Sequence, residues 1–249
     1  MAGTILVRFA FLVTVFSGGL YLYSRRKDDA QYLQFARYSF QLSVLLVLSF
    51  CTYLLYLILT HQFQYTYVWN YSATTLSTPL LVSTFWAGQE GSFSLWTLYT
   101  AILGIFLLSY TARRNYEKEV MMIWCLIQAA LLSMLLIKSP FAMIWDSFPG
   151  ELVHTGPLPP GSANTVWLDQ AKIIWAQFPA EGKGLNPLLQ NYWMVIHPQI
   201  LFSGFTAMAV PYAFAVAALI KRDYAGWIRT AKPWIVYGAA MLGTGIILG

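Results

Sequence analysis

One histidine, His197, stands at the start of a long apolar segment and offers the clearest chemistry in this chain. The run from Asn186 to Ile220 reads NPLLQNYWMVIHPQILFSGFTAMAVPYAFAVAALI. Imidazole is a good axial ligand for haem iron, and Pro198 suits the first turn of a helix, where its missing N–H costs nothing. We predict a helix that begins at His197. Its imidazole either ligates haem iron at a membrane boundary or serves structurally, capping the helix or bonding a backbone carbonyl.

A glutamate, Glu90, lies between Gly88 and Gly91 in the run TFWAGQEGSFSLW from Thr84 to Trp96. An acid at the mouth of an apolar segment must be solvated, paired or hydrogen-bonded. The glycines permit close approach of another backbone or of a flat ligand. Glu90 then either supports a haem site or a partner helix, or is a helix N-terminal acid favoured by the helix dipole.

The other residue types that bind metals give weaker signals. His61 and His154 are candidates for a second axial ligand or are ordinary loop histidines. Cys51 and Cys125 lie far apart within apolar runs and lack C-x-x-C spacing, so they predict neither a thiol relay nor a zinc site. We interpret them as small core residues.

Composition places most of this chain in lipid. Hydrophobic residues make up 58% and charged residues 10% of the chain, against roughly 25% charged in ordinary globular proteins. The sequence predicts an all-α integral membrane protein, a bundle of about six transmembrane helices with one larger periplasmic segment, 139–196, in a single domain over 1–249. The predicted spans are 3–23, 38–60, 79–111, 119–138, 197–220 and 232–249.

Two of these regions need a more detailed prediction. The stretch 79–111 is too long for one straight crossing, so we expect a helix start at Pro79 and a break at Ala87-Gly88, which leaves an interfacial or re-entrant piece before the true span. Within 139–196 we expect an amphipathic helix around Leu168–Phe178.

The positive charge predicts orientation in the membrane. The formal net charge is +5, and eleven of the fifteen Lys and Arg residues fall in three short segments between apolar runs. Basic short loops stay in the cytoplasm, so the N-terminus and the segments 61–78 and 139–196 are predicted to be extracytoplasmic. No basic patch with interleaved aromatic residues remains for nucleic acid. The eleven residues are Arg25, Arg26, Lys27, Arg37, Arg113, Arg114, Lys118, Lys221, Arg222, Arg229 and Lys232.

Both runs resemble the CcmF-type cytochrome c biogenesis proteins, the haem lyase family. The run Thr84 to Trp96 matches the family's W-G-G-x-E-G-S-x-x-x-W signature, with Ala87 in place of the first glycine, and in the run Asn186 to Ile220 Gln199 replaces a second proline. The resemblance implies that His197 is an axial ligand to haem iron and that further residues shape the site: Trp86, Gly88, Gln89, Glu90, Gly91, Trp96, Asn186, Pro187 and Pro198. The matching positions in the run Asn186 to Ile220 are Asn186, Pro187, Leu188, Leu189, Gln190, Ile196, His197, Pro198, Gly204, Pro211, Ala213, Phe214 and Ala215.

The resemblance also implies a function. Members of this family act in the bacterial inner membrane, take haem b from a periplasmic haem chaperone of the CcmE type, and join it to the C-x-x-C-H thiols of apocytochrome c. Thioredoxin-like and CcmH-type maturation proteins and membrane lipid are further implied partners. The family's tryptophan-rich segment and second outer histidine are absent here, so we expect an N-terminal portion of a haem lyase, truncated or encoded by a split gene. The alternatives are a haem-delivery subunit without ligation activity and a non-haem polytopic protein.

Overall fold

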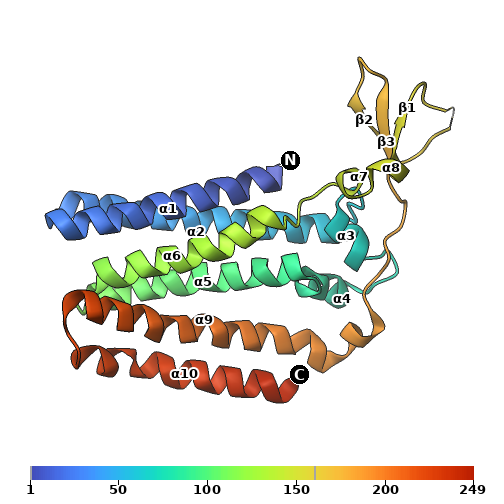
Figure 1. Cartoon of the computed structure of the whole chain (residues 1–249). Coiled ribbons are helices and arrows are strands. Elements are labelled where there is room, and N and C mark those ends of the chain that lie inside the picture. Colours follow the sequence, from blue (N-terminus) through green and yellow to red (C-terminus); the bar gives the residue numbers. More distant parts are fainter. Residues whose placement is uncertain (1, 160) are drawn as a thin grey trace.

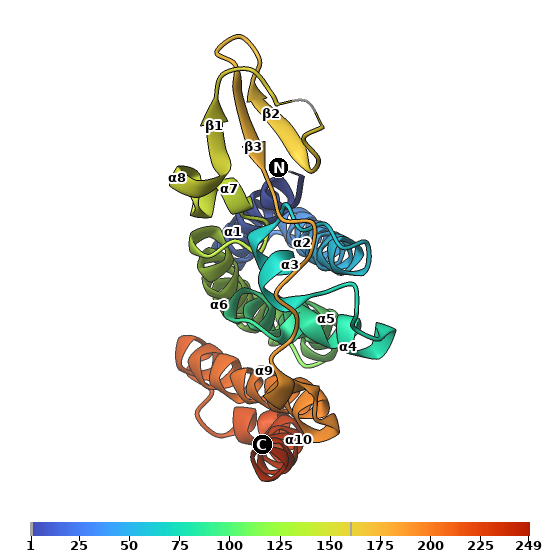
Figure 2. The same ribbon diagram turned by 90° about the vertical axis from the view of Figure 1, so that its right-hand side faces the viewer.

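Six long helices dominate the computed structural model, which describes residues 2–159 and 161–249. Each of the six is long and apolar enough to cross a membrane, so the predicted all-α membrane fold is confirmed. They form three antiparallel pairs, α1–α2, α5–α6 and α9–α10, which stack in that order (Figures 1 and 2). The bounds are α1 Ala2–Lys27, α2 Ala30–Leu59, α5 Gln89–Ala112, α6 Glu117–Ile137, α9 Tyr192–Lys221 and α10 Gly226–Leu248.

The two ends of this bundle differ in structure. At one end the helix pairs are joined by the short turns 28–29, 113–116 and 222–225, and we call this the basic end. The other end, here the loop end, carries every remaining element as well as both ends of the chain (Figure 1). Those elements are α3 Thr66–Tyr71, α4 Thr78–Ser83, η1 Thr84–Trp86, α7 Ile144–Ser147, α8 Pro149–Leu152, β1 Val153–Thr155, β2 Thr165–Asp169, β3 Ile174–Gln177 and η2 Pro187–Gln190.

The predicted break in the region 79–111 is present. Pro79 lies in the first turn of α4, and η1 continues the chain to Trp86. Gly88 then adopts an extended backbone, with φ −108° and ψ 172°, and serves as the N-cap of α5. The long apolar stretch is therefore two helical pieces joined by a short 3₁₀ turn.

The prediction of an amphipathic helix around Leu168–Phe178 is wrong. The segment forms β2 and β3, which pair antiparallel in a three-stranded sheet of order β1-β3-β2. The reason is local: the Asp169 carboxylate accepts hydrogen bonds from the amides of Ala171 and Lys172, at 3.0 and 3.2 Å, which reverses the chain between two strand-forming segments.

The start of α9 also differs from the prediction. The helix begins at Tyr192, because the Asn191 side chain caps it by accepting from the amide of Trp193 at 2.9 Å. Pro198 consequently lies inside the helix rather than in its first turn. Its ring removes one backbone amide donor close to His197.

The bundle core is held by close packing around α6. Trp124 is fully buried and donates from its indole nitrogen to the carbonyl of Thr100 on α5, at 3.1 Å. Gly104 makes room for it, because a Cβ there would lie 2.4 Å from the Phe40 ring and 2.6 Å from the Trp124 nitrogen. Helices α2, α5 and α6 therefore meet at one point.

Ion pairs join α6 to α1 and α2 at the basic end. Arg37 donates two hydrogen bonds of 2.6 Å to the Glu117 carboxylate, which is only 6% exposed. Arg25 donates to Glu119 at 3.2 Å. A paired carboxylate at such a site is far cheaper to bury than an unpaired one.

We expect Arg37→Met to lower the free energy of unfolding by about 3 kcal/mol, because it leaves Glu117 buried without its cation. Thermal unfolding of the detergent-purified protein measures this change. Arg26→Met is the matched control, since Arg26 is exposed and makes no ion pair within the described residues. Equal effects of the two substitutions would contradict the assignment.

Candidate functional site

The position of His197 depends on close packing between α9 and α10. Three glycines on these helices admit the facing helix: Gly204, Gly238 and Gly245. A Cβ on Gly245 would lie 3.0 Å from the Cα of Leu201, so backbone meets backbone at this level. The helices consequently approach closely enough for a side chain of one to bond the main chain of the other.

His197 makes such a bond. Its Nδ1 lies 2.7 Å from the carbonyl oxygen of Gly245 on α10. A carbonyl oxygen can only accept, so Nδ1 carries the proton and donates. The neutral ring then has its lone pair on Nε2, which is the arrangement of an imidazole prepared to bind a metal.

The imidazole is partly covered. The His197 side chain is half-buried, and the backbone of Gly249 lies against its ring. A Cβ on Gly249 would come within 2.4 Å of Cε1 and 2.9 Å of Nε2.

The predicted residues Asn186 and Pro187 shape the approach to α9. The Asn186 side chain accepts from the amide of Leu188 at 3.0 Å, and Pro187 begins the 3₁₀ helix η2. Gln190 donates back to the carbonyl of Leu185 at 2.9 Å. These contacts set the direction of the chain into α9, and none of them reaches His197.

A short segment from Glu181 to Gly184, which we call the strap, binds across α3 just before that point. Lys183 and Gly184 donate from their amides to the carbonyls of Trp69 and Ser72, at 2.8 and 3.0 Å. The Lys183 ammonium also lies 3.9 Å from the centre of the Trp69 ring. The strap thereby holds the chain to the loop end before η2 and α9.

Glu181 anchors the strap through its carboxylate. It accepts from the Thr74 hydroxyl, from the Thr74 amide at 2.9 Å and from the Gly182 amide at 2.9 Å. These bonds to the charged form hold the pKa of Glu181 below its ordinary value of 4.5.

The two motif-bearing segments meet in a small cavity. Trp86 and Ala87 line it from one side, and Pro198 with its neighbours from α9 and η2 lines the other. The cavity measures about 40 Å³, which is too small for a porphyrin. A second contact, between α5 and α9, begins one turn after Pro198. There the centre of the Trp96 ring lies 5.8 and 5.6 Å from the centres of the Phe202 and Phe205 rings. Of the predicted site residues, Trp86 and Pro198 are therefore brought together at the cavity, and Trp96 contacts α9 separately.

Glu90 faces α3 rather than α9. It lies half-buried in the first turn of α5. The pKa of Tyr71 is raised, first by the burial of Tyr71 and second by the nearby charge of Glu90. The neighbouring glycines admit the tyrosines of α3: a Cβ on Gly88 would lie 2.4 Å from the Tyr71 ring, and one on Gly91 would lie 2.0 Å from the Tyr67 hydroxyl. The close approach predicted for these glycines is thus made by α3.

The remaining predicted residues also lie apart from His197. Gln89 accepts from the Lys138 ammonium at 2.9 Å. The His154 ring packs 4.5 Å from Trp175 within the sheet, and His61 contacts Phe63, at 5.8 Å between ring centres. No group of three or more His, Cys, Asp and Glu residues suited to a metal ion occurs within 2–159 and 161–249.

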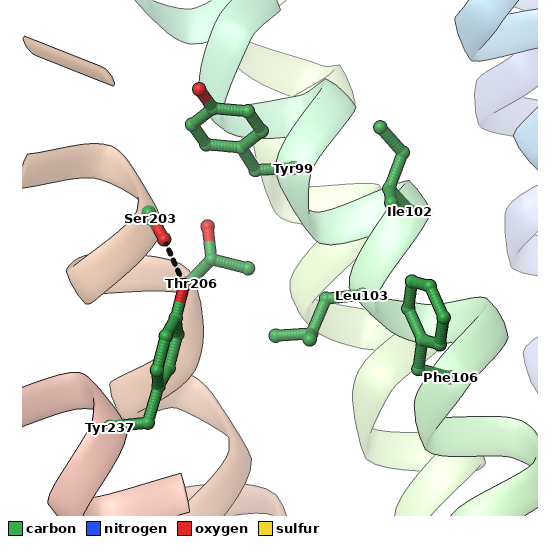
Figure 3. Close-up of a pocket in the computed structure, with 7 residues that line it drawn as sticks. All are labelled: Tyr99, Ile102, Leu103, Phe106, Ser203, Thr206 and Tyr237. Carbon is green, nitrogen blue, oxygen red and sulfur yellow. Dashed lines mark hydrogen bonds between the residues drawn. The ribbon is translucent and has the colours of Figure 1, made fainter. Parts of the chain in front are cut away.

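Sequence reasoning missed a hydroxyl-lined cleft between α5, α9 and α10 (Figure 3). Ser203 and Tyr237 share a hydrogen bond of 2.8 Å on its α9–α10 side, and Tyr99 lines it from α5. The cleft measures about 150 Å³, well below the volume of a haem. Period-3.6 spacing of Tyr99, Leu103 and Phe106 was the available signal, but it does not distinguish a cleft from a lipid-facing surface.

The fold and this site define a multi-pass helical membrane protein whose candidate site residue, His197, lies toward the loop end. The family model for the cytochrome C assembly protein matches residues 86–249, and the chain belongs to that family. The six apolar helices and the bacterial relatives described next identify it as a multi-pass protein of the bacterial inner membrane.

Three relatives illustrate the similarity. The cytochrome c-type biogenesis protein CcmF of Pseudomonas fluorescens is 34% identical over 79% of this chain and 26% of its own length. The CcmF protein of Haemophilus influenzae is 30% identical over 92% of this chain and 31% of its own. A solved structure, the cytochrome c heme lyase CcmF, superposes with a TM-score of 0.66 at 22% identity, over 98% of this chain and 34% of that one. The chain thus spans about a quarter to a third of the relatives it matches.

We expect Glu181→Gln to loosen the strap at neutral pH. A depressed pKa means that the carboxylate stabilises the folded strap fully above its ordinary pKa and loses this effect as the pH falls through the folded-state value. Amide hydrogen exchange at 182–184 should be roughly threefold faster in the variant at pH 7. The difference should shrink below pH 4.5 and vanish once the wild-type carboxylate is protonated.

The control for this prediction is Glu151→Gln. Glu151 is exposed and its side chain makes no hydrogen bond within the described residues, so its substitution should leave exchange at 182–184 unchanged. A pH-independent difference for Glu181→Gln would show that the carboxylate charge is not the cause.

Proposed function

We propose that this chain holds haem b at the loop end during cytochrome c maturation, with Nε2 of His197 as one axial ligand. The observation that carries the proposal is the 2.7 Å bond from Nδ1 to the Gly245 carbonyl, which leaves Nε2 as the free ligand atom. A metal-binding histidine commonly donates its second ring nitrogen to such a partner, which orients the ring and raises its basicity.

The orientation of the bundle supports a site on the outer side of the membrane. Basic short loops remain in the cytoplasm, and here all three lie at the basic end. The loop end, with His197 and the N-terminus, then faces the periplasm. A haem held there is accessible to a periplasmic haem chaperone of the CcmE type and to apocytochrome c.

The chain's contribution is positioning. In cytochrome c maturation each haem vinyl group takes up a cysteine thiol of the substrate: a carbon–sulfur bond forms, and the thiol hydrogen passes to the vinyl carbon. His197 orients the haem for this addition, and the strap and the packing of Trp96 on Phe202 and Phe205 keep α9 in place. Both thiols belong to apocytochrome c, because Cys51 and Cys125 of this chain are buried inside helices, and CcmH-type proteins would act as maturation partners.

Haem delivery without ligation is a second candidate function. One observation favours it: among residues 2–159 and 161–249, His197 is the one histidine whose ring makes a hydrogen bond. A site with one protein ligand would hold haem less firmly than a site with two, which suits transfer to another protein. Thioether formation by the purified chain with haem and apocytochrome c would select ligation, and haem transfer without it would select delivery.

We expect His197→Ala to remove the axial ligand and to weaken haem binding by roughly tenfold or more. Haem titration of the detergent-purified protein, followed by its absorption spectrum, measures this directly. His154→Ala is the control, because His154 lies on β1 against Trp175 and should leave the spectrum unchanged. An unaltered spectrum in His197→Ala would refute the ligand assignment.

We expect Gly245→Ala to alter haem binding without removing any ligand atom. Its Cβ would meet the Leu201 backbone at 3.0 Å, push α10 away and lengthen the bond to Nδ1. We expect a weaker affinity for haem and a changed haem reduction potential, of either sign. Gly243→Ala is the matched control, since no atom lies within 4 Å of the Cβ it would add. Identical potentials in the two variants would contradict the role of Gly245.

A further inference from the structure

The positive charge of this chain is concentrated at the basic end. Eleven Lys and Arg residues lie there with five acidic residues, a net charge of +6, whereas the rest of the chain carries four basic and five acidic residues. Membrane orientation accounts for where this charge is. Membrane orientation does not explain why a cavity lies among these charged residues.

A cavity of about 320 Å³ opens among the helix ends at this position. Its walls come from α1, α2, α5, α6 and α9, together with the turns between α1 and α2 and between α5 and α6. The lining residues are Arg25, Asp28, Leu33, Arg37, Ala112, Asn115, Glu117, Lys118, Glu119 and Lys221. The volume is several times that of a water molecule, whose share of the liquid is about 30 Å³, so a polar group of several atoms can enter.

The charges in the cavity are almost, but not fully, balanced. Glu117 is paired with Arg37 and Glu119 with Arg25. Lys118 is paired with Asp28, and this bond holds the pKa of the Asp28 carboxyl below its ordinary value. One cation of the lining therefore remains without a carboxylate.

That cation is Lys221. Its ammonium donates to the backbone carbonyl of Asn115 and lies 4.8 Å from the centre of the Tyr116 ring, and it makes no ion pair within the described residues. Asp223, two residues on, accepts from the Tyr116 hydroxyl and from the Gly226 amide. The four cations and three carboxylates of the lining leave a net charge of +1.

We propose that this cavity binds the phosphodiester group of an anionic phospholipid, with Lys221 as its principal contact. A phosphodiester carries a single negative charge, which matches the single unbalanced cation, and basic pockets between transmembrane helices on the cytoplasmic side suit such head groups. Leu33 and Ala112 provide apolar wall beside the charged groups. Free phosphate shares the oxygen chemistry, but it lacks the glycerol and acyl portions that a site at the bilayer surface can also contact.

The test is native mass spectrometry of the full chain in detergent with phosphatidylglycerol, with phosphatidylethanolamine, or with inorganic phosphate. We expect phosphatidylglycerol to remain bound to the wild type, and Lys221→Gln to weaken its binding roughly fivefold to tenfold. Lys232→Gln removes the same charge from an exposed position at the same end, outside the cavity, and should retain binding. Lys221→Arg should also retain it, which separates loss of the cation from misfolding.

Three outcomes would overturn the proposal. Equal losses of phosphatidylglycerol binding in Lys221→Gln and Lys232→Gln would show that the lipid responds to diffuse surface charge and not to the cavity. Equal binding of phosphatidylethanolamine would show that the net anion is not recognised. Displacement of phosphatidylglycerol by millimolar inorganic phosphate, with saturable phosphate binding that Lys221→Gln abolishes, would assign the cavity to a free anion.

Discussion

The close packing of α9 against α10 is the constraint on which the candidate site depends. In a bilayer, apolar side chains gain little by leaving lipid, so helix association relies on close contact between small residues and on interhelical hydrogen bonds. Both are present here: glycines bring the two backbones together, and His197 bonds the Gly245 carbonyl across the interface. The same bond that joins the helices determines which imidazole nitrogen is free, so stability and ligand chemistry share one contact.

The loop end supports this contact from outside the helix pair. The strap fastens the chain to α3, Asn186 and Asn191 turn it into η2 and α9, and Trp96 packs against the phenylalanines of α9. These contacts act in series, because each sets the position from which the next segment starts. Residues far from His197 in sequence thus help to place its ring without touching it.

The two ends of the bundle are held together by different interactions. At the loop end, backbone hydrogen bonds, aromatic contacts and the Glu181 carboxylate hold irregular backbone in place. At the basic end, ion pairs tie α1 and α2 to α6, and charge is nearly balanced within a cavity. A membrane protein must keep one set of loops cationic to be oriented, and the pairing of Arg25, Arg37 and Lys118 with carboxylates limits the mutual repulsion of these cations.

Local sequence determined much of this protein. Apolar runs of sufficient length predicted the six helices, and Pro79 and Gly88 predicted the break before α5, because each of these signals acts within a few residues. The pattern of motifs also indicated the family and singled out His197. Local reasoning misplaced the start of α9, where the Asn191 cap outweighed Pro198, and took β2 and β3 for a helix. Tertiary structure alone decided what each motif residue faces: Glu90 faces the tyrosines of α3, and His197 faces Gly245, 48 residues away. Such pairings depend on how helices stack in three dimensions, and the spacing of residues along one helix carries no information about the surface that will cover it.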